Sequence, residues 1–347
     1  METKLNFLSF LFLMFIISAC SVAERQGETQ RQPALRAKTP LEVPAFSART
    51  MSLPDETEMA EHKRSLDDIA ELERSGSWFQ GLAFIESGIR ENSGDLAGAV
   101  AAAYKELSYA YGLGLIQKKE IEAGLLNVHD TKSEEIVSAA VITMTAFLNE
   151  QWTEAAVDLT FLFDDSDEPD SFTRWMSLVC SLEKGAAATG DAASTAEYRR
   201  INTTYSSIRA RYAQFPEYWY RGARAFSGAV AAEFAENCIN LSVQGPFAEE
   251  CRKIIAAYNG LGSKDGLLIK TRYEIESIIS LSVNSGNPRI LDSLLPLIGL
   301  PDNPYTVFAV SALRSLNNIP GFRDYFYGQA RVSTGRLAER LSYICRS

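Results

Sequence analysis

The 347-residue chain contains little histidine and cysteine, and it lacks the short motifs on which most enzyme classes depend. With two histidines and no Gly-x-Ser-x-Gly element, nothing in it favours a Ser-His-Asp triad. A phosphate-binding loop is missing, and no Gly-x-Gly-x-x-Gly follows a strand-like segment, which disfavours the usual nucleotide sites. His62 and His129 have no closely spaced cysteine partners, so we expect neither a metal nor another cofactor.

Positive charge is in the minority as well. The chain has 34 basic and 44 acidic residues, a net charge of −10, which argues against a dedicated nucleic-acid surface. The same charge repels anionic lipid headgroups, so membrane contact is expected to come from an anchor and not from a basic face.

Strand signals are also missing, because β-branched runs joined by Asn-Gly or Asp-Gly turns do not occur. Apolar residues instead recur three and four positions apart, as in residues 136–148, which predicts an all-α fold. Asp95, Pro216 and Asp265 are among the residues expected to begin helices, since aspartate caps helix N-termini and proline suits the first turn.

The N-terminus has the form of a secretory leader. An apolar run from Leu5 to Ile17 is followed by Ser18, Ala19 and Cys20. The segment Ile17–Cys20 resembles the lipobox of bacterial lipoproteins, and this resemblance implies a signal peptide at 1–19, cleavage between Ala19 and Cys20, and lipid such as palmitate on Cys20. The alternative is an ordinary secretory signal with a chance cysteine.

The same resemblance implies a location. Ser21 stands where an aspartate would signal retention in the inner membrane, so the outer membrane is favoured, with the folded part facing the periplasm. Residues 20–50 are polar and include three prolines, a composition that predicts a disordered tether between the lipid and the folded part.

Helical pairs with tetratricopeptide-like features follow. Trp152 and Ala155 have the aromatic-x-x-Ala spacing, and Trp175 comes six residues after Pro169. This region resembles tetratricopeptide repeats, which implies a right-handed solenoid of helix pairs over residues 51–263. Residues 264–347 are expected to form a C-terminal helical segment that packs on the repeats as a cap. The alternative is an irregular helical bundle whose tryptophans belong to its core.

A basic and aromatic stretch is the candidate binding face. Tyr218, Trp219, Arg221 and Arg224 are residue types that dominate protein interfaces. If they share one exposed face, they predict contact with an envelope protein or peptide. If they divide between two helix faces, the aromatics are core and the arginines shield it. The favoured function is a non-enzymatic interaction scaffold, and a small-molecule binder is a further possibility.

An enzymatic alternative depends on Glu86. Glu86-Ser87, Gly114-Leu115-Ile116-Gln117 and Asn127-Val128 resemble three short motifs of lytic transglycosylases, although the first two are too far apart. The resemblance implies peptidoglycan cleavage with Glu86 as general acid and base, which needs a carboxyl whose pKa is raised by an apolar pocket.

Two local features remain open. Cys238 and Cys251 flank a turn at 244–246, and a disulfide there would add about 3 kcal/mol of stability in the chain-entropy model. The acidic run 164–168 lacks the glycine and the spaced glutamate of an EF-hand, so a solvated loop is favoured over a calcium site.

Overall fold

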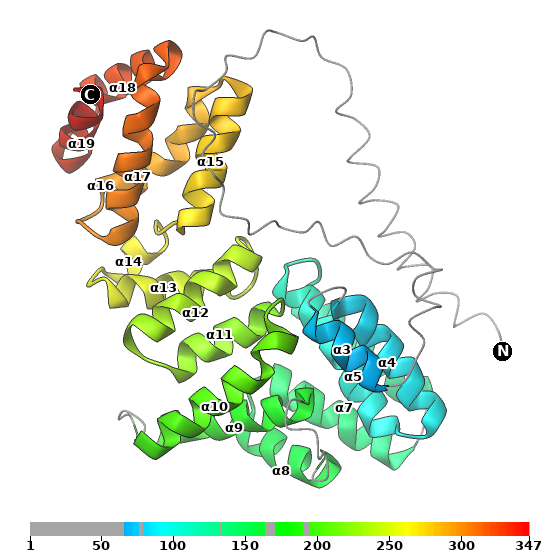
Figure 1. Cartoon of the computed structure of the whole chain (residues 1–347). Coiled ribbons are helices and arrows are strands. Elements are labelled where there is room, and N and C mark those ends of the chain that lie inside the picture. Colours follow the sequence, from blue (N-terminus) through cyan, green and yellow to red (C-terminus); the bar gives the residue numbers. More distant parts are fainter. Residues whose placement is uncertain (1–65, 76–78, 132–133, 164–170, 190–194, 347) are drawn as a thin grey trace, which may run out of the picture. The chain divides into compact units, whose positions relative to one another are not determined.

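The computed structural model describes residues 66–75, 79–131, 134–163, 171–189 and 195–346 (Figure 1). Every regular element within these residues is a helix, so the all-α prediction is confirmed. Among the same residues, none of the helices combines the length and the apolar character needed to cross a membrane.

Seventeen α-helices and two 3-10 helices make up the described part of the chain. Their bounds are α3 Leu66–Arg74, α4 Phe79–Ser93, α5 Leu96–Gly112, α6 Lys118–Thr131, α7 Glu135–Leu148, α8 Trp152–Phe163, α9 Phe172–Thr189, α10 Thr195–Tyr212, α11 Pro216–Ala225, α12 Gly228–Leu241, α13 Ala248–Tyr258, α14 Ser263–Gly266, α15 Arg272–Ser285, η1 Pro288–Leu294, α16 Leu295–Gly299, α17 Pro304–Ser315, η2 Leu316–Asn318, α18 Pro320–Val332 and α19 Gly335–Cys345.

Local signals explain several helix starts. The Asp95 side chain accepts a hydrogen bond from the Gly98 amide and caps α5, and Pro216 occupies the first turn of α11, as expected. The expected start at Asp265 is wrong, because this residue lies inside the four-residue helix α14. The next long helix, α15, begins at Arg272 behind a reciprocal capping box between Thr271 and Glu274.

Consecutive helices pack against each other along much of the chain. These pairs include α4 with α5, α7 with α8, α8 with α9, α11 with α12, α12 with α13 and α18 with α19. Contacts between helices that are not neighbours in the chain also occur: α5 contacts α7, α9 and α11, α3 contacts α10, and α19 contacts α16 and α17. Helix α5 is rich in alanine, and small side chains allow several helices to approach it closely.

The apolar interior has two parts. A large cluster continues from Ala97 to Cys345 through almost every helix after α4. A small separate cluster of Ile69, Leu82 and Ile85 lies between α3 and α4. Since the apolar contacts of α3 belong to this small cluster, ion pairs have an important part in joining α3 to α5 and α10.

Candidate functional site

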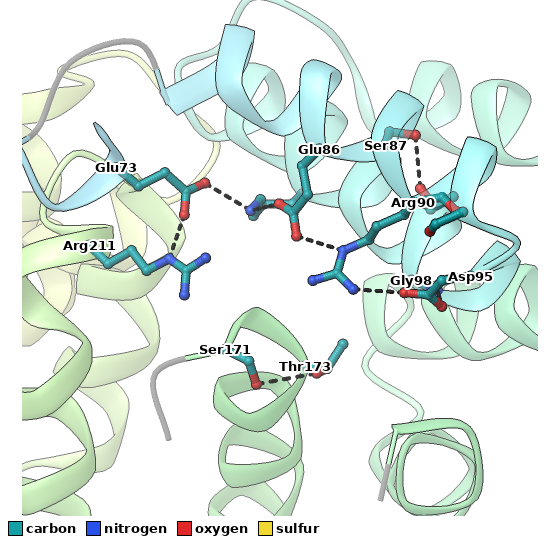
Figure 2. Close-up of polar contacts among 12 residues, drawn as sticks. Glu73, Glu86, Ser87, Arg90, Asp95, Gly98, Ser171, Thr173 and Arg211 are labelled. Atoms are coloured by element: carbon teal, nitrogen blue, oxygen red, sulfur yellow. Dashed lines mark hydrogen bonds and ion pairs between the residues drawn. The ribbon is translucent and has the colours of Figure 1, made fainter. Parts of the chain in front are cut away.

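Six ionisable side chains from α3, α4, α5 and α10 form a series of contacts in which positive and negative groups alternate (Figure 2). We call this series the charge chain; its members, in order, are Arg211, Glu73, Lys105, Glu86, Arg90 and Asp95. Three acids balance three bases, so the set is neutral as a whole.

The inner half of the charge chain is buried. The Glu73 carboxylate accepts hydrogen bonds from Lys105 Nζ at 2.8 Å and from Arg211 Nε at 2.5 Å. The Glu73 side chain has 0% exposure, so this charge is stable inside the protein only because two cations contact it. These contacts attach α3 to both α5 and α10.

The outer half reaches the surface. Lys105 Nζ also donates to Glu86, and Arg90 Nε donates to the other Glu86 oxygen at 2.9 Å. Arg90 then donates to Asp95 at 2.7 Å, and the Asp95 side chain is 44% exposed. Asp95 is also the N-cap of α5, so the outer end of the charge chain coincides with a helix start.

The electrostatics of Glu86 differ from those of a general acid. Burial by itself would raise its pKa, but the charges of Lys105 and Arg90 outweigh burial and lower the pKa to about 2. A glycosidase acid must hold a proton near neutral pH, which requires a raised pKa. In this arrangement Glu86 is ionised and both of its oxygens contact cations, so the geometry supports an ion-pair role.

Among the residues that the structure describes, Glu106 is one of three other glutamates whose pKa is raised, with Glu217 and Glu276. Burial on α5 raises the pKa of Glu106 to about 7, with no opposing charge. The sequence contains a weak sign of this environment, because Glu106 lies in the alanine-rich helix that contacts several others. Sequence reasoning missed Glu106 because helical spacing alone does not tell how deeply a neighbouring helix covers a position.

Arg221 is the centre of a second buried polar cluster. Its guanidinium lies 4.8 Å from the centroid of the Trp152 ring and 5.0 Å from that of Tyr220. It donates to Glu217 at 3.1 Å and to Glu150 at 3.0 Å. Burial would lower the pKa of Arg221, but Glu217 and its other neighbours reverse this and raise it. Arg221 is therefore a buried cation that joins α11 to α8 and to the end of α7.

The four residues expected to form an exposed partner-binding face do not do so. Tyr218, Trp219 and Arg221 are buried, and only Arg224 is partly exposed. The Tyr218 hydroxyl donates to the Tyr205 carbonyl, and Trp219 Nε1 donates to the Ala213 carbonyl. The reason is that α11 packs against α5, α9, α10, α12 and α13, so little of its surface is left for a partner.

Cys238 and Cys251 lie together inside the protein as free thiols. The hydrogen bond with Cys251, together with burial, raises the pKa of the Cys238 thiol well above its ordinary value. The packing of α12 on α13 thus brings the two sulfurs into contact, as the disulfide prediction requires, and oxidation of the pair stays a prediction.

Several predicted features lie outside the described residues. These are Ala19 and Cys20, the tether at 20–50, His62 and the acidic run 164–168. Within the described ranges, no group of three or more histidine, cysteine, aspartate or glutamate side chains is arranged to hold a metal ion.

The chain matches no protein-family model, and comparison with curated proteins and with solved structures found no significant similarity.

Proposed function

We propose that this chain is a lipid-anchored bacterial envelope protein that acts as a scaffold for protein or peptide partners. The anchor is assigned to Cys20, with cleavage after Ala19, residues 20–50 as the tether, and the folded part facing the periplasm from the outer membrane. The observation that carries this proposal is the sequence Ile17–Cys20 directly behind an apolar run.

We further propose that helix pairs in residues 51–263 are arranged as tetratricopeptide-like repeats. Support comes from the packing of consecutive helices, which is the contact pattern of helical-repeat proteins. The start of α8 at Trp152 and the burial of Ala155 agree with the aromatic-x-x-Ala element of these repeats. The contact between α3 and α10 is a departure from a simple repeat, because it joins distant parts of the chain.

The binding role is preferred to peptidoglycan cleavage because of the surroundings of Glu86. Its low pKa and its contacts with Lys105 and Arg90 disfavour proton donation to a glycosidic oxygen. The cleavage hypothesis predicts that the purified mature chain releases muropeptides from peptidoglycan and that Glu86→Gln abolishes this release. We expect no release from either protein.

The anchor is tested by Cys20→Ala. In the native host we expect this variant to incorporate no labelled fatty acid and to leave the membrane fraction, because a single cysteine carries all of the acyl chains. Cys180→Ala is the matched control, since it removes a buried thiol elsewhere and should leave acylation unchanged. Normal processing and membrane recovery of Cys20→Ala would refute the anchor.

The scaffold role is tested by cross-linking of the anchored chain in intact cells. We expect the same envelope partner in repeated experiments with the wild type, and its loss when Cys20→Ala removes the chain from the membrane. Repeated cross-linking that returns no reproducible partner would contradict the scaffold role while leaving the anchor intact.

A further inference from the structure

The last helices carry an excess of positive charge in a chain that is acidic as a whole (Figure 1, orange to red). Residues 304–347 contain six arginines and no lysine, and Asp324 and Glu339 are their only acidic side chains. This local excess of four positive charges contrasts with the net −10 of the whole chain. Residues 304–347 are therefore basic although the chain as a whole is acidic.

Two of the six arginines join one C-terminal helix to another segment, whereas Arg323 lies over the ring of Tyr327 on its own helix, 5.7 Å from the ring centroid. Arg340 donates to the carbonyls of Ile298 and Leu300 and to the Asp302 carboxylate, which attaches α19 to the end of α16. Arg314 lies over the ring of Tyr343, 4.5 Å from its centroid. These two side chains stabilise the packing of the C-terminal helices.

The other four arginines are exposed. Within the described residues, none of them forms an ion pair, and both Asp324 and Glu339 are exposed as well. Together with three exposed neighbours they form a surface that we call the basic hairpin. Its members are Arg323, Tyr327, Arg331, Val332, Arg336, Tyr343 and Arg346.

The basic hairpin extends over α18 and α19, which pack against each other. Arg323, Tyr327 and Arg331 are four residues apart, which places them on one face of α18. The Tyr327 hydroxyl donates to the Cys345 carbonyl at 3.3 Å, so this face meets the end of α19 beside Arg346. At the end of α18, next to the turn between the helices, Val332 is 76% exposed, and it lies between Arg331 and Arg336 in the sequence.

We propose that the basic hairpin binds an anionic phospholipid surface. Guanidinium groups donate bidentate hydrogen bonds to phosphate oxygens, and tyrosine suits the level of the headgroups. Val332 adds an apolar side chain at a turn flanked by cations, which suits shallow insertion between headgroups. An acidic protein segment fits the charge equally, but it gives no reason for an exposed valine at the turn, so lipid is favoured.

This inference rests on the proposed function only in that the lipid anchor brings the chain to a membrane. The hairpin would then provide a second contact that turns the C-terminal helices toward the lipid and leaves the more acidic remainder of the chain facing away. It also revises the expectation that the anchor alone makes the membrane contact, because a local patch determines binding within a Debye length of about 10 Å at 0.1 M salt.

The test uses the mature chain, residues 20–347, with Cys20→Ser so that no acyl chain is attached. Flotation is measured with phosphatidylcholine vesicles that contain about one third phosphatidylglycerol, and with phosphatidylcholine vesicles alone. Each arginine near an anionic surface strengthens partitioning about fivefold, so Arg331→Gln with Arg336→Gln should weaken binding about 25-fold. The matched control is Arg174→Gln with Arg199→Gln, which removes two exposed arginines from α9 and α10.

The expected result is binding to the anionic vesicles only, loss of binding in about 0.5 M NaCl, and weakening by the hairpin pair but not by the control pair. Absence of binding to anionic vesicles, or equal weakening by both pairs, would overturn the proposal. If the hairpin pair leaves vesicle binding unchanged but removes a cross-linked acidic protein, the occupant is that protein and the lipid proposal is wrong. Because no acyl chain is present, failure here leaves the Cys20 anchor unaffected.

Discussion

Glu73→Gln is the sharpest test of the charge chain. The substitution keeps the shape of the side chain but removes a buried charge that contacts Lys105 and Arg211. Glutamine retains one acceptor oxygen, so one of the two hydrogen bonds can survive, while its amide group faces a cation. The two cations then lose the charge that offsets their own burial.

The expected cost follows from these contacts. A hydrogen bond to a charged group contributes about 1.5–3 kcal/mol, and breaking a buried ion pair by removal of one partner costs about 3–5 kcal/mol. Since Glu73 has no exposure and two such bonds, we expect Glu73→Gln to cost about 3–5 kcal/mol. If α3 detaches without global unfolding, the same free energy appears as loss of hydrogen-exchange protection in residues 66–74.

The assay is urea unfolding of residues 20–347 without an acyl chain, followed by the helical circular dichroism signal, together with hydrogen exchange of α3. Glu71→Gln is the matched control on the same helix, because Glu71 is 74% exposed and its ion pair with Arg74 lies at the surface. We expect this control to cost less than about 0.5 kcal/mol.

A paired substitution separates the loss of charge balance from the loss of packing. Lys105→Met with Glu73→Met removes one cation and one anion that contact each other, so the double substitution should cost less than the sum of the costs of Lys105→Met and Glu73→Met measured separately. If Glu73→Gln costs no more than Glu71→Gln, then α3 is not attached through the charge chain and the reasoning is refuted.

Three further outcomes are expected. Folding lowers the pKa of Glu86 from 4.5 to about 2, so the ionised carboxylate contributes up to about 3 kcal/mol to the free energy of unfolding. This contribution is present above pH 5 and is lost as the pH falls toward 2. The stability of Glu86→Gln should therefore depend less on pH between 5 and 2 than that of the wild type. Folding raises the pKa of Glu106 to about 7, so the stability of the wild type falls as the pH rises from about 5 to 8. Glu106→Gln should be similar to the wild type in stability at pH 5 and more stable at pH 8, by up to about 3 kcal/mol. Gly222→Ala places a Cβ atom 2.2 Å from Phe234 Cδ1 and should lower the free energy of unfolding in urea by about 1–3 kcal/mol. In Gly88→Ala the new Cβ meets no atom within 4 Å, so this variant should be more stable by about 0.5–1 kcal/mol. Equal effects of the two substitutions would contradict the packing of α11 on α12.

The helical class and some helix starts could be predicted from the sequence because they depend on neighbours along the chain. Hydrophobic spacing reports which side of a helix is buried, and a cap such as Asp95 needs only the amide three residues ahead. Thr271 and Glu274 carried the same kind of signal, and the start of α15 could have been found by the capping-box rule. The apolar run and Cys20, from which the anchor is proposed, are likewise local patterns.

The residues that form the charge chain and the cluster around Arg221 could be identified only from the tertiary structure. Glu73 and Arg211 are 138 residues apart, and no local pattern shows that α3 lies against α10. Arg221 carries the same charge in the sequence as the exposed Arg331, yet packing buries the first among aromatic rings and leaves the second in water. Backbone hydrogen bonds and capping act over a few residues, so sequence alone determined that the chain is helical. Which charges are buried, and with what partners, depends on how distant helices meet, and only the tertiary structure decided it.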